Sequence, residues 1–286
     1  MSDKILISII IPTYNRAATI GKTIDSFIAQ DYTAWEMLVV DDNSTDNTKD
    51  VIEQYHEKDY RIHYLLNERR KGAQGARNTG ILHAKSDWVI LFDSDDYAYP
   101  NFVSRIVAEI DDKTDVISCY VRKVWVDGSQ TSIEEWGAEG KIEHLMLRSW
   151  AYIGFLGGYR KSKLFEIGLL DEDCPCMQEW DTHIRLSRIC TYKQIKEPLM
   201  DYMWGNEDAI SKNRQKNKNG YCYVMKHNET RWKEIEPDAF YSIARWLFFD
   251  VDVEHKWMLL KMHPRMFFRL PRMLLGRIKR GLYHKT

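Results

Sequence analysis

Short apolar runs alternate with helical repeats over the first 110 residues, and this alternation limits the possible folds more than any other feature. Four runs have the pattern of buried strands, at residues 5–11, 35–40, 62–66 and 88–92. Between them apolar residues recur at helical spacing, as Ile20, Ile24, Phe27 and Ile28 do. Alternating strands and helices form a parallel sheet with right-handed crossovers and helices on both faces. We therefore predict an α/β fold with a mostly parallel sheet, which a strand at residues 116–124 continues.

Several boundaries follow from residue chemistry. Pro12 has no N–H group for a strand ladder, so we expect the first strand to stop there. Asp46 is a suitable cap for the next helix, which we expect to run to about Lys58. Gly72 and Gly75 provide a flexible entry to a third helix, and a fourth is expected at residues 101–110.

Polar and acidic residues follow three of the predicted strands directly. They are the segments Pro12–Asn15, Asp41–Asp42 and Asp93–Asp96. Ligands of parallel sheets bind beyond the carboxyl ends of the strands, so we expect these segments to share one edge. The three carboxylates of the last segment repel one another, and a hard cation such as Mg²⁺ or Mn²⁺ would offset that repulsion. For an isolated Asp-x-Asp, a solvated acidic turn is the alternative.

Phosphate binding would need such a cation, because the chain contains neither a P-loop nor a G-x-G-x-x-G fingerprint. Carboxylates with a divalent ion, facing an edge that also carries Tyr14, suggest a nucleoside diphosphate as the ligand. The residue pattern alone takes the prediction no further.

Charge is balanced over the whole chain but not along it. There are 41 Lys and Arg against 42 Asp and Glu, for a net charge of -1. Residues 255–286 contain nine of the basic residues and no acidic one, which leaves 32 basic and 42 acidic residues elsewhere. A basic tail with Phe, Leu and Met suits contact with an anionic membrane surface, although docking on the acidic body is an alternative. The acidic remainder argues against nucleic-acid binding.

The five cysteines are odd in number and form no C-x-x-C pair, which argues against a disulfide framework and against a structural zinc site. The N-terminus lacks the length and the cleavage site of a signal peptide. No stretch approaches 18 uninterrupted apolar residues. We therefore expect a protein made in the cytosol.

Four motifs in order resemble the family 2 glycosyltransferases of GT-A (Rossmann-like) fold. The motifs are Ile7–Arg16, Val39–Asp46, Gly75–Gly80 and Leu91–Asp96, and they occur in this order across about the first 110 residues. The resemblance implies an inverting transferase that moves a sugar from a nucleoside-diphosphate donor, with a UDP-sugar favoured, to an acceptor hydroxyl. It also implies Mn²⁺ or Mg²⁺ as the cofactor.

The same resemblance assigns donor-side roles residue by residue. Pro12 and Tyr14 would flank the nucleobase of the donor. Asp42 would hydrogen-bond to the nucleobase, with Asp41 as the neighbour of Asp42. Lys71 and Arg77 are candidates for contacts near the diphosphate or the ribose. Asp93 would face the ribose or the donor sugar, next to Ser94, and Asp95 or Asp96 would bind the metal.

The second half of the chain is expected to supply the acceptor side. The segment Met177–Leu186 resembles the family's region that carries the catalytic carboxylate, and Glu179 stands at that position. This is a departure, because the family mostly has aspartate there, but a longer glutamate still serves as a general base. Asp181 is the reserve candidate, and an acidic first helical turn is the alternative for both. Trp180 either lines the acceptor subsite or belongs to the core.

Residues 202–211 resemble the family's loop that closes over the donor, with Ser211, Lys212 and Arg214 as weaker candidates for diphosphate contacts. We expect a GT-A domain at residues 1–215, with a nucleotide-sugar half at 1–110 and an acceptor half at 111–215. Residues 216–286 would form a helical region with the basic, membrane-associating tail.

The function that the resemblance implies is sugar transfer in bacterial surface polysaccharide synthesis, either of lipopolysaccharide O-antigen or of capsule. The acceptor would be a glycan or an undecaprenyl-linked saccharide, and the protein would be peripheral at the inner face of the cytoplasmic membrane. The competing interpretation is a non-catalytic nucleotide- or carbohydrate-binding module of the same fold, because Glu179 replaces the expected aspartate.

Overall fold

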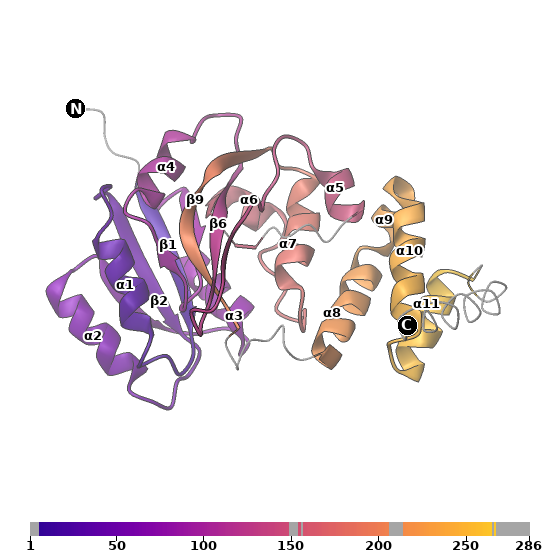
Figure 1. Cartoon of the computed structure of the whole chain (residues 1–286), viewed down its shortest axis with the longest axis horizontal. Helices are drawn as coiled ribbons and strands as arrows, with labels where there is room; N and C mark the ends of the chain where they lie inside the picture. The colour runs from indigo at the N-terminus through magenta and orange to yellow at the C-terminus, as the bar shows by residue number, and fades with distance from the viewer. Residues whose placement is uncertain (1–5, 149–153, 156, 206–213, 265, 267–286) are drawn as a thin grey trace. The chain divides into compact units, whose positions relative to one another are not determined.

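A computed structural model of the chain describes residues 6–148, 154–155, 157–205, 214–264 and 266. The chain divides into two compact units (Figure 1). The first unit contains residues 1–146, 150–174 and 178–209, and the second contains 147–149, 175–177 and 210–286. The domain boundary expected at residue 215 stays a prediction.

The strands and the first helices alternate as far as β4. The strands are β1 (Ile7–Thr13), β2 (Trp35–Asp41), β3 (Ile62–Leu66), β4 (Trp88–Leu91), β5 (Tyr97–Ala98), β6 (Val116–Trp125), β7 (Thr131–Glu134), β8 (Gly157–Arg160) and β9 (Tyr192–Trp204). The helices up to β9 are α1 (Ile20–Ile28), α2 (Thr48–Lys58), α3 (Ala73–His83), α4 (Phe102–Ala108), α5 (Glu143–Arg148), α6 (Lys161–Glu166) and α7 (Gln178–Ser187).

The sheet has the strand order β3-β2-β1-β4-β8-β6-β9-β5, with β7 paired to β6. β1 is parallel to β2 and to β4, and β2 is parallel to β3, which confirms the mostly parallel sheet predicted for the first half. β8 runs antiparallel between β4 and β6. It fits there because its glycines allow close approach: a Cβ on Gly157 would lie 2.0 Å from the carbonyl oxygen of Ile117.

Helices cover both faces of the parallel part of the sheet. Ile9 and Ile11 of β1 are fully buried in one core with residues of α1 and α4, and α1 and α2 lie next to each other along this face (Figure 1). On the other face α3 packs closely, because a Cβ on Gly80 would lie only 2.4 Å from Ile10 Cγ2. Phe27 and Phe92 meet edge to face at 4.9 Å, a geometry that adds about 0.5–1.5 kcal/mol to area burial.

Two predicted boundaries differ from the structure. β1 does not end at Pro12, which pairs with Val40, and this is possible because β4 ends at Leu91 before it would need the N–H group that proline lacks. The N-cap of α2 is Asn47, while the Asp46 carboxylate accepts hydrogen bonds from Thr48 N at 3.0 Å and from Ala17 N at 3.1 Å.

The prediction of a donor-closing loop at residues 202–211 is wrong for its first residues. Residues 202–204 are the last residues of β9, which pairs in parallel with β6 up to Trp125 opposite Trp204. Ser211 and Lys212 lie outside the described residues, and Arg214 is the first residue of α8.

The second unit is helical in its described part. Its helices are α8 (Arg214–His227), α9 (Glu229–Ile235), α10 (Pro237–Phe248) and α11 (Val253–Met262). Trp232 and Phe240 are fully buried and pack edge to face at 5.6 Å, which joins α9 to α10. No helix among the described residues has the length and apolar character needed to cross a membrane. Most of the predicted basic tail, at residues 265 and 267–286, lies outside the described residues.

Candidate functional site

The turns that follow β1 and β2 are joined to each other at the carboxyl edge of the sheet. Asn15 and Asn43 have φ angles of 51° and 65°, in the left-handed region that asparagine tolerates better than most residues. The N–H group of Asn15 donates to Ser44 Oγ at 2.8 Å, and Thr45 N donates to Asn15 Oδ1 at 2.7 Å. The structure thus brings together two of the three segments that were expected at one edge.

Asp41 is buried and holds its own turn together. Its Oδ1 accepts hydrogen bonds from Ser44 N at 2.9 Å and from Ser44 Oγ at 2.5 Å, and its Oδ2 accepts one from the Tyr64 hydroxyl at 3.0 Å. Burial and the neighbouring Asp41 carboxylate raise the pKa of Tyr64 to about 12, so the phenol stays a donor. Asp41 therefore stabilises the turn that positions the next residue.

Asp42 has a donor on each carboxylate oxygen. Asn67 Nδ2 donates to Oδ1 at 2.7 Å, and Gly72 N donates to Oδ2 at 2.8 Å. Its own N–H donates to the carbonyl oxygen of Thr13 at 2.8 Å, so Asp42 connects β1 to the loop after β3. A carboxylate oxygen accepts more than one hydrogen bond, so Asp42 keeps capacity for a further donor.

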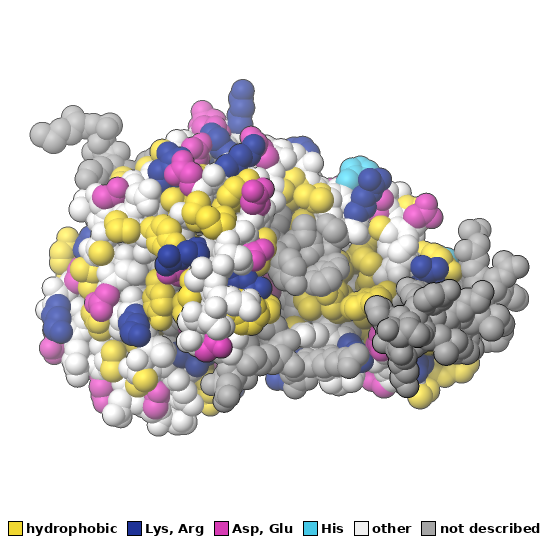
Figure 2. Space-filling view, in the orientation of Figure 1, with side chains coloured by type: hydrophobic (Ala, Val, Ile, Leu, Met, Phe, Trp, Pro, Cys, Tyr) yellow, Lys and Arg dark blue, Asp and Glu magenta, His cyan; other side chains and the backbone are white. Residues whose placement is uncertain are grey.

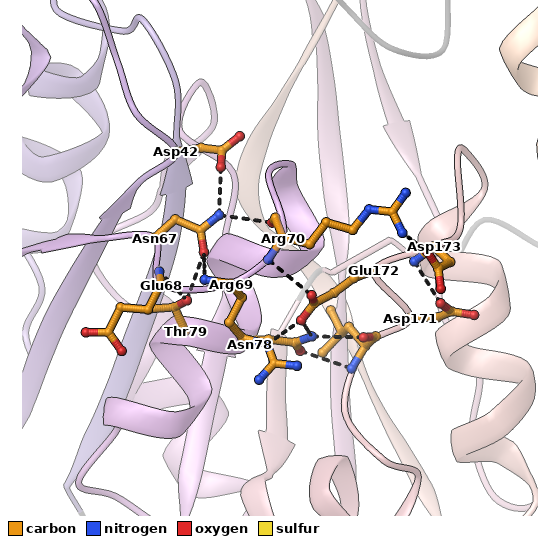
Figure 3. A network of polar contacts seen from close by, with 11 residues as sticks. Asp42, Asn67, Glu68, Arg69, Arg70, Asn78, Thr79, Asp171, Glu172 and Asp173 are labelled. Atoms are coloured by element: carbon orange, nitrogen blue, oxygen red, sulfur yellow. Dashed lines mark hydrogen bonds and ion pairs between the residues drawn. The ribbon is translucent and has the colours of Figure 1, made fainter.

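The loop after β3 is fixed by a network that reaches the segment after α6 (Figure 3). Asn67 donates to Asp42 and to the carbonyl oxygen of Arg70, and its Oδ1 accepts from Thr79 Oγ1 at 2.9 Å. Glu172 accepts a hydrogen bond from Asn78 Nδ2 at 2.7 Å and also pairs with the guanidinium of Arg69. These contacts hold residues 67–72 in place next to Asp42.

Tyr14 and Lys71 lie together at the exposed side of this edge. Tyr14 follows β1 with 44% of its surface exposed, and Lys71 Nζ lies 4.9 Å from the centre of its ring. Pro12 is buried at the end of β1. The edge therefore presents an accessible aromatic ring with a cation over it.

The acidic segment after β4 has one buried and two partly exposed carboxylates. Asp96 is 3% exposed and its Oδ1 accepts a hydrogen bond from Met203 N at 2.8 Å, whereas Asp93 and Asp95 are partly exposed. Burial raises the pKa of Asp96 well above its usual range, and the charges of Asp93 and Asp95 raise it further. Ser94 is buried, and its carbonyl oxygen accepts from Thr23 Oγ1 at 3.0 Å. Three mutually repelling oxygen donors fit a hard divalent cation.

Arg77 of α3 makes its contacts inside the protein. It is 3% exposed, its Nη2 donates to Asp93 Oδ1 at 2.5 Å, and its Nη1 donates to Gln74 Oε1 at 2.8 Å. The guanidinium also lies 4.6 Å from the centre of the Phe155 ring. Arg77 therefore contacts the acidic segment from the interior of the protein.

Glu179 is the second residue of α7. Its side chain keeps some exposed surface, yet protein surrounds it closely enough that burial raises the pKa of its carboxyl group. Arg77 lowers this pKa and Asp93 raises it, so the three residues interact electrostatically. In the described part of the chain, no other side chain forms a hydrogen bond with the Glu179 carboxylate. The group is therefore free to accept a proton.

The neighbours of Glu179 point into the protein. Asp181 is fully buried and its Oδ2 accepts from Arg185 Nε at 2.8 Å, while Arg185 also donates to the carbonyl oxygens of Ile167 and Leu169. Trp180 is 6% exposed, and its indole N–H donates to the carbonyl oxygen of Met146 at 3.0 Å. A base role for Asp181 and an acceptor role for Trp180 stay predictions, and each would use a largely enclosed side chain.

Four residues that position the site were not singled out from the sequence. They are Asn67, Asn78, Phe155 and Glu172. Asn78 lies within the Gly75–Gly80 motif, which was a signal for the helix but not for its contact with Glu172, 94 positions away. Asn67 lies in no motif, and Phe155 and Glu172 lie in the stretch that precedes Met177–Leu186, which gave no signal for their contacts.

Comparison with known proteins gives one family and several relatives. A family model described as "Glycosyl transferase family 2" matches residues 8–180. The UDP-Glc:alpha-D-GlcNAc-diphosphoundecaprenol beta-1,3-glucosyltransferase WfgD of Escherichia coli is 46% identical over 94 residues, which are 33% of this chain and 36% of WfgD. The matched part thus spans about a third of the length of such curated relatives.

Two solved structures share the fold over most of the chain. The Staphylococcus aureus TarS fragment 1–349, in complex with UDP-GlcNAc, superposes with a TM-score of 0.67 at 17% identity and covers 90% of this chain and 79% of the fragment. The mannosyltransferase PcManGT of Pyrobaculum calidifontis, in complex with GDP-Man and Mn²⁺, gives a TM-score of 0.58 at 16% identity, covering 98% and 88%. At these identities the likeness concerns the fold, and it supports the predicted GT-A architecture.

Proposed function

Since this chain belongs to glycosyl transferase family 2, we propose that it transfers a sugar from a nucleoside-diphosphate sugar to an acceptor hydroxyl. The observation that carries the proposal is the electrostatic coupling of Glu179, Arg77 and Asp93, which come from α7, α3 and the end of β4. A carboxylate with a raised pKa next to an acidic cluster at the carboxyl edge of a parallel sheet suits a general base beside a donor site.

The nucleotide would bind where the turns after β1 and β2 meet. Tyr14 and Pro12 would flank the base, and Asp42 would accept a hydrogen bond from it, with Asp41 holding the turn. Lys71, which lies over the Tyr14 ring, would reach the ribose or the diphosphate. We propose UDP as the nucleotide, in keeping with the UDP-Glc donor in the name of WfgD and with the UDP-GlcNAc of the TarS complex.

Asp95 and Asp96 would hold Mn²⁺ or Mg²⁺, with Asp93 and Ser94 toward the ribose or the donor sugar. The all-oxygen donor set supports this, as does the Mn²⁺ in the PcManGT complex. When bound, the ion would neutralise negative charge on the diphosphate.

Glu179 would accept the proton of the acceptor hydroxyl as its oxygen attacks the anomeric carbon. The bond to the diphosphate oxygen breaks in the same displacement, which inverts the anomeric centre and converts an α-linked donor into a β-linked product. A base whose pKa is raised toward the working pH accepts a proton more readily. Arg77 counters part of this rise and so favours the ionised carboxylate.

The acceptor would be a glycan or a lipid-diphosphate-linked saccharide in the synthesis of a bacterial surface polysaccharide. The support is the named activity of WfgD and of TuaG from Bacillus subtilis, a putative teichuronic acid biosynthesis glycosyltransferase. With such an acceptor the enzyme would work at the inner face of the cytoplasmic membrane, where the basic residues of 255–286 would meet anionic lipid.

A panel of nucleotide sugars, measured by thermal shift with and without Mn²⁺ and then by donor hydrolysis, tests the proposal. We expect one UDP-sugar to stabilise the protein in the presence of Mn²⁺ and to be hydrolysed slowly. Binding without any hydrolysis would support the non-catalytic module instead, and the absence of nucleotide binding would contradict both.

A further inference from the structure

Four aromatic side chains and one lysine gather on a single face of the paired strands β6 and β9. Lys123 lies opposite Tyr202 and Trp125 lies opposite Trp204, so strand alternation puts these four side chains on the same face. The rings of Trp125 and Trp204 pack edge to face with their centres 6.1 Å apart. The ring of Tyr202 has its centre 6.2 Å from that of Trp204, and Trp136 packs edge to face on Tyr202 with ring centres 5.1 Å apart. We call these five residues the aromatic face.

The aromatic face remains partly accessible to solvent. Trp125, Trp136, Tyr202 and Trp204 are each only partly buried, although Trp136 and Tyr202 also pack against the main core. Lys123 Nζ lies 3.9 Å from the centre of the Trp204 ring and 5.2 Å from that of Trp125, so a hydrogen-bond donor sits among the rings. Hydrophobic side chains with Lys or Arg among them are visible at the surface over β6 and β9 (Figure 2).

The aromatic face continues into the acidic segment. The backbone N–H of Met203, between Tyr202 and Trp204, donates to Asp96 Oδ1 at 2.8 Å. Burial raises the pKa of Tyr202 far above its usual range, and the charges of Asp96, Asp93 and Glu179 raise it further. Tyr202 is therefore a neighbour of both the acidic segment and the proposed base.

We propose that the aromatic face is an acceptor subsite that binds a pyranose ring of the acceptor glycan. One side of a pyranose carries mostly C–H groups and packs on an aromatic ring, while its hydroxyl groups need donors such as Lys123. The nucleobase of the donor is proposed to bind elsewhere, at Tyr14 in the turn after β1. The inference rests on the proposed function, because Glu179 as general base requires the acceptor to bind next to it.

Saturation-transfer NMR with a panel of methyl β-glycosides of glucose, galactose, N-acetylglucosamine and N-acetylgalactosamine tests this subsite. In the wild-type protein we expect at least one probe to receive saturation at its ring C–H protons. In Trp204→Ala the saturation-transfer signal should fall about tenfold, and in Trp204→Phe, which keeps an aromatic ring, part of that signal should remain. The matched control is Trp257→Ala, because Trp257 is 58% exposed in α11 of the other unit and should leave the signal unchanged.

Binding of UDP with Mn²⁺, followed by thermal shift, separates the two hypotheses and checks that each variant is folded. If wild-type protein binds no nucleotide, the proposed function fails. If it binds UDP but no probe receives saturation, or if Trp204→Ala keeps the full signal, the acceptor subsite is wrong and the proposed function stands. If Trp204→Ala weakens the affinity for a UDP-sugar but not for UDP, the face binds the donor sugar and the proposal is overturned.

Discussion

The guanidinium of Arg77 donates a 2.5 Å hydrogen bond to Asp93, and only 4% of the Arg77 side chain is exposed against 38% for that of Asp93. The two residues act in opposite directions on a third, since Arg77 lowers the pKa of Glu179 and Asp93 raises it. Burial is the main cause of the raised pKa of Glu179, and an ion pair on the donor side adjusts this pKa.

Replacing Arg77 should move the acid limb of the pH–rate profile. Arg77→Leu removes the charge that lowers the pKa of Glu179, so this pKa rises. Because only the ionised carboxylate accepts a proton, activity would then be lost at a higher pH as the pH falls. The measurement is kcat for sugar transfer between pH 5 and 8, with Arg105→Leu as a control at the surface ion pair with Glu197. An acid limb at the same pH in Arg77→Leu would separate Arg77 from the base.

Glu179→Gln should slow transfer strongly and keep donor binding. General-base catalysis contributes about 10²–10⁴-fold, and we expect a loss of kcat in this range with an unchanged affinity for UDP. Unchanged turnover would transfer the base role to Asp181.

The same variant should also change stability with a definite sign. A raised carboxyl pKa means that the folded state binds more protons than the unfolded state, so Glu179 costs stability increasingly as pH rises from its unfolded-state pKa to its folded-state pKa. Glu179→Gln should therefore raise the melting temperature at pH 8 more than at pH 4. A melting temperature lowered equally at both pH values would show that the carboxylate stabilises the fold.

Gly75→Ala should displace the loop that holds Asp42. A Cβ at Gly75 would lie 1.8 Å from the carbonyl oxygen of Arg70, which accepts the hydrogen bond from Asn67 Nδ2. We expect a loss of about 1–3 kcal/mol in the free energy of unfolding, measured in urea, together with weaker UDP binding. Gly21→Ala in α1 is the matched control, since its Cβ would meet only the movable Tyr55 side chain at 3.0 Å. Equal effects of the two substitutions would contradict this role for Gly75.

The first four strands could be predicted because their signals are local. Runs such as residues 35–40 are apolar on both faces and end at polar residues, and β2 was found at Trp35–Asp41. β8 could not be predicted in the same way. Its place between β4 and β6 depends on Gly157 meeting Ile117 and not on a periodic pattern of its own.

The residues of the candidate site also fall into those with a local sequence signal and those without one. Asp42, Asp96 and Glu179 could be chosen because carboxylates after strands, or at a helix start within a family motif, are visible in the sequence. Their partners could not, because Asn67 and Glu172 act through contacts between residues far apart in the chain. Nor does a sequence reveal that Trp180 is nearly enclosed while Tyr14 is exposed.

Calorimetric titration of the wild-type protein with UDP, in Mn²⁺ and then in EDTA, measures whether a cation at the acidic segment after β4 contributes to nucleotide binding. We expect Mn²⁺ to strengthen UDP binding about tenfold or more, and we expect this gain to disappear in Asp95→Asn or Asp96→Asn but not in Asp50→Asn, an exposed aspartate of α2. Equal UDP affinity in Mn²⁺ and in EDTA would contradict the claim that the acidic segment after β4 holds a cation for the diphosphate.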